Sequence, residues 1–261
     1  MSIRSAAVAA LFYPADGVVL RDMIKSALSR VQFVTDAPKG IIVPHAGYSY
    51  SAQTAACAYA TLKNSAYSRV VLVGPAHRLA FNGIAISASS SFRTPLGDVA
   101  VAVDSYKLPA LFDTVLVHDG AHALEHSLEV QLPFLQVVLG EFEILPLCVG
   151  AVRASQLFSL LEFLYGDEHT LFVISSDLSH YHPYTQANRL DHTTVNTILA
   201  GEQVSGEQAC GATAVNAMTL LAKQHGLRAC LLDYRNSGDT AGEKDRVVGY
   251  TAIAFEATDV S

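Results

Sequence analysis

Residues 69–78, RVVLVGPAHR, contain the pattern that decides the fold. Four apolar residues in succession, Val70–Val73, are typical of a strand that is covered on both faces of a sheet. The chain then turns at a glycine and a proline and reaches His77. Residues 40–51, GIIVPHAGYSYS, repeat the pattern with an apolar run, a proline and His45. Two buried strands that each end close to a histidine predict a site beyond the carboxyl ends of a sheet.

The rest of the chain supplies further strands and the helices to cover them. Apolar runs recur at 144–149 and 171–174. Residues 227–257 predict two antiparallel edge strands joined by a polar loop, Asn236 to Asp245. Helical patterns cover 51–64, 126–140, 154–166 and 212–226, with Pro133 expected to kink or divide the second. We therefore predict an α/β sandwich with a mixed, largely parallel central sheet, forming a single domain over residues 1–261.

Composition narrows the functional classes. The chain has 261 residues, of which 51% are hydrophobic and 16% charged, and a net charge of −7. The absence of a lysine and arginine cluster argues against nucleic acid or an anionic membrane as a partner. No run of eighteen apolar residues predicts a membrane span, and no signal peptide is evident. The four cysteines have no CxxC spacing, so we expect reduced thiols and a cytoplasmic location.

A third strand end adds further reactive groups. TLFVISSDLSHYHPY, residues 170–184, carries Asp177 and His180 just after its apolar run. If the three strands are parallel neighbours, these groups share one crevice with the two histidines, which predicts either a metal site or a metal-free acid–base pair. Cys210 precedes the helix predicted at 212–226. A helix N-terminus lowers the pKa of a thiol, so we expect a thiolate that ligates metal, although many free cysteines simply pack.

Six segments in sequence order carry a resemblance to a known family. VPHAGYSYS, GPAHR, EHSLEVQLPFL, ISSDLSHY, ACG and VVGYTAIAF, spread over residues 40–255, together resemble the Memo family, whose bacterial and archaeal members are called AmmeMemoRadiSam system protein B. The resemblance implies a fold similar to class III extradiol dioxygenases of the protocatechuate 4,5-dioxygenase type, which hold non-haem iron.

The resemblance also implies a set of metal ligands. His45 and His77 correspond to the two histidine ligands of those dioxygenases, and Cys210 takes the place of their carboxylate. A thiolate shifts the preference of such a site towards Cu(I) or Zn without excluding Fe(II). We therefore expect Fe(II) or Cu(I), with Zn as the alternative.

Further residues follow from the same motifs. His126, Asp177 and His180 are implied to be catalytic, as proton carriers or substrate-orienting groups. Tyr50 and Arg78, which lie beside the two ligand histidines in the sequence, are expected to contact substrate.

These residues favour a metal-dependent oxidoreductase that uses non-haem iron or copper and acts on an unknown small molecule or peptide. Two alternatives remain open. One is a module that binds phosphopeptides or proteins, and the other is a metal-free hydrolase with Cys210 as its nucleophile. The family's bacterial name implies that a radical SAM protein and an AMMECR1-like protein act in the same pathway.

Overall fold

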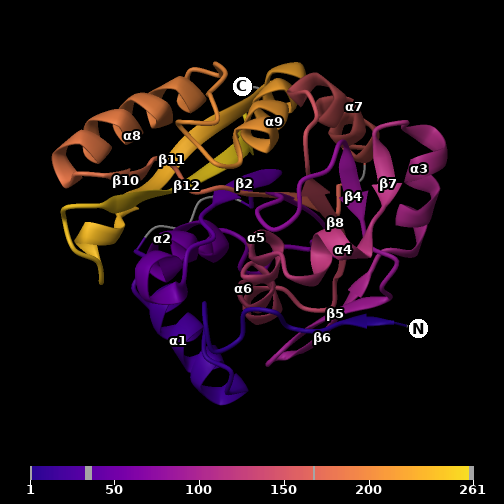
Figure 1. The fold of residues 1–261 in the computed structure, drawn as a ribbon, viewed down its shortest axis with the longest axis horizontal. Helices are drawn as coiled ribbons and strands as arrows, with labels where there is room; N and C mark the ends of the chain where they lie inside the picture. The colour runs from indigo at the N-terminus through magenta and orange to yellow at the C-terminus, as the bar shows by residue number, and fades with distance from the viewer. Residues whose placement is uncertain (1, 33–36, 167, 259–261) are drawn as a thin grey trace.

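The computed structural model describes residues 2–32, 37–166 and 168–258, which form one twisted sheet with helices on both faces (Figure 1). The described strands are β1 (Ile3–Arg4), β2 (Gly40–Val43), β3 (Arg69–Pro75), β4 (Ile84–Ile86), β5 (Ser91–Thr94), β6 (Gly97–Val101), β7 (Val115–Val117), β8 (Glu143–Val149), β9 (Thr170–Ser175), β10 (His180–His182), β11 (Leu227–Asn236) and β12 (Val247–Ala257). The main path through the sheet runs β1-β5-β6-β8-β3-β9-β2-β12-β10. β4 and β7 branch from β8, and β11 pairs with β12.

Four neighbouring strands at the centre of the sheet are parallel. β3 lies between β8 and β9, and β2 continues the sheet beyond β9. Val71 of β3 is opposite Leu145 of β8 and Phe172 of β9, and all three side chains are fully buried. Burial on both faces explains why these strands read as continuous apolar runs. The predicted central sheet is therefore confirmed.

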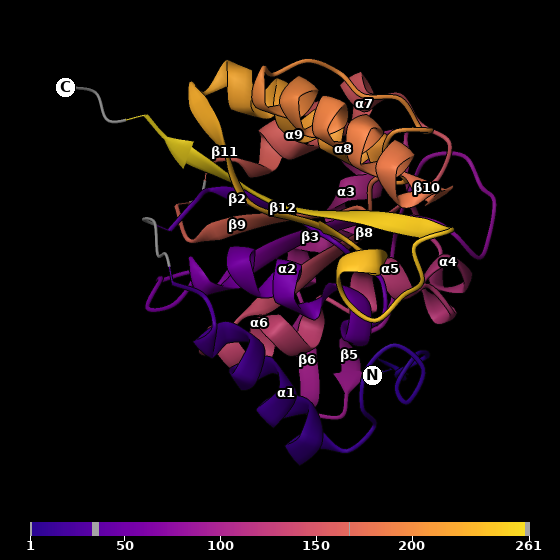
Figure 2. The ribbon, with the colours of Figure 1, turned by 90° about the vertical axis from the view of Figure 1, so that its left-hand side faces the viewer.

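Helices cover the sheet as two layers (Figure 2). One layer contains the N-terminal helices and packs in one hydrophobic core, and the other contains the C-terminal helices and packs in a second core. The first layer comprises α1 (Gly17–Ser29), α2 (Tyr48–Ala60), α5 (His126–Glu129) and α6 (Leu132–Val138); the second comprises α7 (Ala154–Leu164), α8 (Tyr184–Leu199) and α9 (Ala212–Gln224); α3 (Leu108–Leu111) and α4 (Asp119–Ala123) lie in the connections.

The segment 126–140 forms two helices instead of one. Pro133 occupies the first turn of α6, where its missing N–H costs no helical hydrogen bond. α5 therefore ends at Glu129, and His126 is the first residue of a separate short helix. This division separates the short helix that carries His126 and Glu129 from the helix that follows it.

Glu129 ties the N-terminal segment to the rest of the fold. Its fully buried carboxylate pairs with the buried guanidinium of Arg4 and accepts a hydrogen bond from the Tyr13 hydroxyl. The backbone N–H groups of Ala7 and Val8 donate to the same carboxylate at 2.7 and 3.0 Å. A buried carboxylate with this many donors is satisfied, so its role is structural.

The C-terminal strands form the predicted antiparallel pair. β11 and β12 pair from Leu227 opposite Ala257 to Asn236 opposite Gly249. β12 also pairs with β2, with Ile253 opposite Ile42. The C-terminal pair therefore closes the side of the sheet that lies nearest to the first histidine segment.

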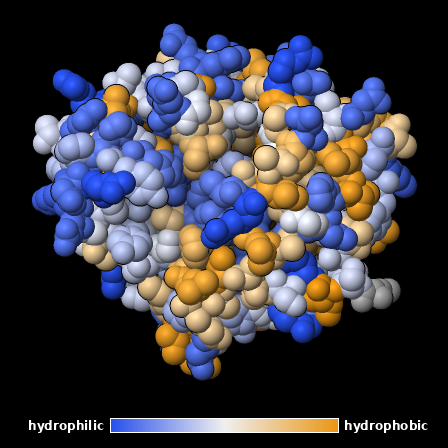
Figure 3. Space-filling model, viewed as in Figure 1, coloured by the Kyte–Doolittle hydropathy of each residue, from blue (hydrophilic) through white to orange (hydrophobic). Residues whose placement is uncertain are grey.

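Apolar side chains also reach the surface over the N-terminal helix layer (Figure 3). Leu11, Val18 and Val19, at and before the start of α1, are among the most exposed apolar residues. No helix in the described ranges combines the length and apolar character that crossing a bilayer requires.

Candidate metal centre

Three parallel strands deliver the residues of the site to one edge of the sheet. β2 is followed by His45, β3 by His77 and β9 by Asp177, and β9 lies between the other two strands. The carboxyl ends of parallel neighbours meet at the same edge. The predicted convergence of the three strand ends is therefore confirmed.

Three imidazoles gather at this edge. His45, His77 and His126 each offer a ring nitrogen, and these atoms lie within 4.8 Å of one another. Their ring centroids are 4.7 to 5.4 Å apart. The third member of this group is His126, whereas the sequence analysis proposed Cys210 as the third ligand and gave His126 a catalytic role. His126 comes from the first residue of α5 and not from a strand.

Cys210 lies against the same cluster. Its Sγ atom is 3.2 Å from Nε2 of His45, and the backbone N–H of Asp177 donates to Sγ at 3.3 Å. The next residue, Gly211, allows this approach. A Cβ atom at Gly211 would lie 2.7 Å from the carbonyl oxygen of Ser175, at the end of β9. The ACG segment therefore needs its glycine to bring the thiol to the strand end.

The expected acidity of Cys210 is wrong for the protein without a cation. Burial, reinforced by the nearby Asp177 carboxylate, raises the pKa of this thiol to about 12. The thiol precedes the N-cap of α9, and the cost of burying a charge exceeds the favourable effect of the helix end. Cys210 is therefore a neutral thiol whose S–H can donate to the imidazole of His45.

The hydrogen bonds around Ser175 fix the tautomer of His45. The Ser175 hydroxyl donates its only proton to the carbonyl of Ser127 at 2.6 Å. Its two other partners must then donate to it: the side-chain amide of Gln131 at 2.9 Å and Nδ1 of His45 at 2.9 Å. His45 therefore carries its proton on Nδ1, and the Nε2 lone pair faces Cys210.

Glu125 orients the other two imidazoles. Its buried carboxylate accepts from Nδ1 of His77 at 3.0 Å and from the His77 backbone N–H at 2.6 Å, and it lies 3.2 Å from Nδ1 of His126. Although burial opposes ionisation, the adjacent His126 ring and hydrogen bonds from His77 and the backbone N–H of Ser127 hold the pKa of Glu125 well below its usual range. Glu125 is thus an anion next to the Nδ1 atoms of both rings, which leaves their Nε2 atoms on the far side. No sequence pattern indicated this role for Glu125, which immediately precedes His126.

His45 is held in its neutral form. Burial and the neighbouring rings of His77 and His126 lower its pKa well below the ordinary value. A neutral imidazole with a free Nε2 is the state that binds a metal.

Asp177 and His180 lie in the same site. The Asp177 carboxylate accepts the backbone N–H of His45 at 2.8 Å and lies 3.8 Å from Nε2 of that residue. Burial raises the pKa of Asp177. His180 is the first residue of β10, which pairs with β12 across the site.

A cavity of about 590 Å³ opens onto these groups. It is lined by the three clustered histidines, Asp177, His180 and Tyr50, among others. Arg78, an exposed residue three positions after β3, is not among the residues that line it. The arginine in its lining is Arg246, which lies 5.0 Å above the ring of Tyr181. Arg246 could not be predicted from the sequence because it follows a polar loop without an apolar pattern.

Comparison with known proteins identifies the family of the chain. A family model described as Memo-like protein matches residues 4–254. A MEMO1 family protein of Methanopyrus kandleri is 35% identical, and the match covers 97% of this chain and 98% of that protein. Relatives in Methanosarcina mazei and Aquifex aeolicus are 35% and 33% identical, and in each case the match covers 98% of this chain and 100% of the relative. Matches of this extent show that the chain belongs to the Memo-like family.

Proposed function

We propose that this protein is a metal-dependent oxidoreductase whose metal ion is held by His45, His77 and His126, with Cys210 as a fourth ligand. The observation that carries the proposal is the group of three imidazole nitrogens within 4.8 Å of one another. Outer contacts support it, because Ser175 and Glu125 hold the Nδ1 side of the rings. Metal-binding histidines usually have such partners.

The distances suit an ion after the rings move inward. Two nitrogens that each lie ~2.1 Å from one tetrahedral ion are roughly 3.4 Å apart. The observed limit of 4.8 Å therefore requires the imidazoles to rotate towards one another when the ion binds. A sulfur and a nitrogen on one tetrahedral ion lie roughly 3.6 Å apart, close to the 3.2 Å between Cys210 and His45.

The donor set indicates the metal. Imidazole suits zinc, copper and iron, and a thiolate favours Cu(I) or Zn. We propose Fe(II) or Cu(I) because the proposed oxidoreductase reaction needs a redox-active ion, and zinc has no redox chemistry. When bound, such an ion would supply Lewis acidity and electron transfer at the base of the cavity.

The residues of the chain would divide the remaining tasks. Cys210 would lose its proton on binding the ion, since a metal ligand must be a thiolate. His180 lines the cavity without belonging to the three-histidine group, so it is the proton carrier that we propose. Asp177, through its contact with the backbone of His45, would hold that ligand in place and orient the substrate. Tyr50 and Arg246 would contact the substrate from the cavity wall.

A thiol hydrolase is the second candidate. The 3.2 Å contact between Cys210 and His45 is the observation that favours it, because a cysteine nucleophile needs an adjacent base. Such a mechanism needs a readily ionised thiol, whereas the pKa of Cys210 is raised. It also leaves the imidazoles of His77 and His126 without a role. We therefore rank the metal enzyme first.

Metal analysis of protein purified without oxygen tests the proposal. We expect about one Fe or Cu ion per wild-type chain and a sharp loss in His45→Ala, His77→Ala and His126→Ala. His192→Ala, which changes an exposed histidine on α8, is the matched control and should keep its metal. Equal metal content in the control and the three site variants would contradict the proposal.

A further inference from the structure

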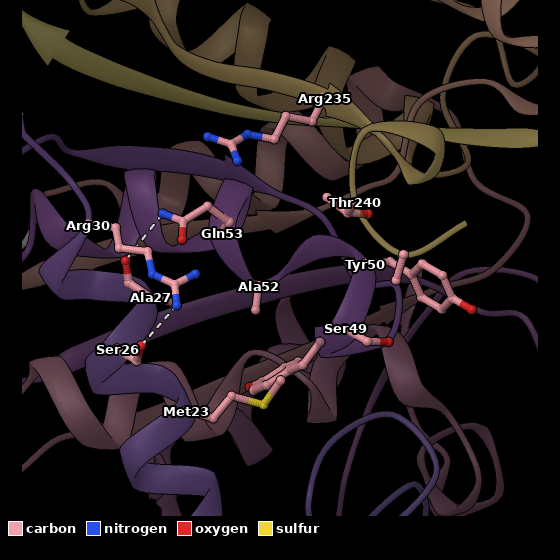
Figure 4. Close-up of a pocket in the computed structure, with 12 residues that line it drawn as sticks. Met23, Ser26, Ala27, Arg30, Ser49, Tyr50, Ala52, Gln53, Arg235 and Thr240 are labelled. Carbon is pink, nitrogen blue, oxygen red and sulfur yellow. Dashed lines mark hydrogen bonds between the residues drawn. The ribbon is translucent and has the colours of Figure 1, made fainter. Parts of the chain in front are cut away.

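Figure 4 shows the residues that line a second cavity, of about 570 Å³. It lies between α1, α2 and the segment that follows β11. Tyr50 lines both cavities. The segment after β11 also passes from one to the other, because Thr240 lines the second cavity and Gly242 lines the first. The two cavities are therefore neighbours across Tyr50.

The second cavity has a cationic and hydroxyl-rich lining. Arg30, which caps the C-terminus of α1, and Arg235 of β11 lie on either side of Gln53 in Figure 4. Hydroxyl groups of Ser26, Ser49 and Thr240 belong to the same lining. Among the described residues that line this cavity there is no aspartate or glutamate. Two guanidinium groups at one cavity, of which only Arg235 has a carboxylate partner among the described residues, indicate a site for an anion.

The two arginines differ in their ion pairing. Arg235 pairs with Asp233, with Nε 3.0 Å from a carboxylate oxygen, and this contact sets the direction of its side chain. The Arg30 guanidinium donates to the Ser26 hydroxyl, at 3.3 Å, and forms no ion pair within the described residues. Arg30 therefore has no carboxylate partner in that part of the chain, while Arg235 retains N–H donors beyond those that it gives to Asp233.

The first half of α2 runs from the histidine cavity to the second cavity. Gly47, just before α2, lines the histidine cavity, and Gln53 lines the second cavity. Six residues of helix correspond to roughly 9 Å along its axis. A molecule that reached both cavities would need to be about that long.

We propose that the second cavity is a substrate subsite that binds a carboxylate or phosphate group through Arg30 and Arg235. Guanidinium groups bind both anions in a bidentate geometry, which gives direction as well as charge. The role as a subsite rests on the proposed metal-dependent function. The substrate is then an elongated anionic molecule, with its anionic end past Tyr50 and its reacting end near the histidines.

Calorimetry with glutarate and with inorganic phosphate tests the anion site without metal. We expect at least tenfold weaker binding to Arg30→Gln and Arg235→Gln than to wild type. The matched controls are Arg21→Gln on α1 and Arg189→Gln on α8, which remove the same charge at exposed positions outside this cavity. Tighter binding of one probe identifies the anion as a carboxylate or a phosphate. Equal weakening in the controls, or none in the two cavity variants, would overturn the proposal.

A spectroscopic experiment tests the connection between the cavities. Suberate, a longer dicarboxylate, should change the visible spectrum of Co(II)-loaded protein, whereas acetate at the same concentration should not. The change should disappear in Arg30→Gln at unchanged Co(II) content. Persistence of the suberate effect in that variant would overturn the subsite role. Failure to bind Co(II) would instead count against the proposed function, and the calorimetric result would still decide whether the cavity binds anions.

Discussion

Cys210 and His45, which are 165 residues apart in the sequence, lie in hydrogen-bond contact, with Sγ 3.2 Å from Nε2. Because Ser175 fixes the His45 proton on Nδ1, the thiol can donate its proton to the Nε2 lone pair. A metal ion at the histidines would replace this proton and bind both atoms. The contact therefore connects the ionisation of the thiol to metal binding.

The reactivity of Cys210 should consequently depend on metal. We expect its alkylation by iodoacetamide to slow when Fe(II), Cu(I) or Zn(II) is added and to recover with a chelator, because the reacting lone pair is committed to the ion. Mass mapping separates Cys210 from the three other cysteines, which serve as internal controls. Alkylation at Cys210 that is insensitive to all three metals would favour the hydrolase.

Glu125→Gln should weaken metal binding by about 10–100-fold, because it removes the charge that orients His77 and His126. Anaerobic titration with Fe(II) measures the effect. Glu141→Gln makes the same change at an exposed position and should bind as wild type does. An unchanged affinity in Glu125→Gln would show that the carboxylate does not support the metal ligands.

Glu129→Ala should lower the free energy of unfolding by about 3–5 kcal/mol, because it leaves the buried charge of Arg4 without its partner. Urea denaturation of the metal-free protein measures this loss. Arg4→Ala should cost a similar amount, and the double variant should cost less than the sum of the two. Additive losses would mean that the two charges do not interact.

Acid should destabilise the fold through His122. Burial lowers the pKa of this side chain to about 4, below the usual value near ~6.5. Between those values the unfolded chain binds a proton that the folded chain does not, so stability falls as the pH decreases from 6.5 to 4. The full effect is about 3 kcal/mol.

His122→Gln tests this assignment, since glutamine can still donate to the carbonyl of Ala85 but does not titrate in this range. Denaturation of both metal-free proteins at several pH values should give a shallower dependence for the variant. Identical slopes would show that other groups account for the acid sensitivity.

The sequence allowed the strand ends to be predicted because each buried strand carries an unbroken apolar run. His45, His77 and Asp177 were therefore expected at one edge. The resemblance implied a catalytic role for His126, but its place among the three clustered imidazoles depends on contacts of α5 with the two strand ends, which no local pattern indicates. Glu125 opens the EHSLEVQLPFL segment and Arg246 follows a polar loop, but the roles of both arise from contacts between distant segments.

The helices α1 and α8 were also missed. α8 is rich in threonine and polar residues, and its place depends on long-range contacts of Asp191. That carboxylate accepts the backbone N–H of Ser179 at 3.0 Å and packs against Gly249 of β12, where a Cβ would lie 2.1 Å from it. Tertiary contacts outweigh local propensity at such positions. The likeness to extradiol dioxygenases and the identity of the metal stay predictions.

X-ray absorption at the metal edge of the loaded protein tests histidine ligation most directly. We predict about three imidazole nitrogens at ~2.0–2.1 Å and one sulfur at ~2.3 Å from the ion. Cys210→Ala should lose the sulfur contribution and keep the imidazoles, and His126→Ala should lose one imidazole or the metal itself. A wild-type spectrum without imidazole scattering, or a metal environment that is unchanged in both variants, would contradict the assignment of this site.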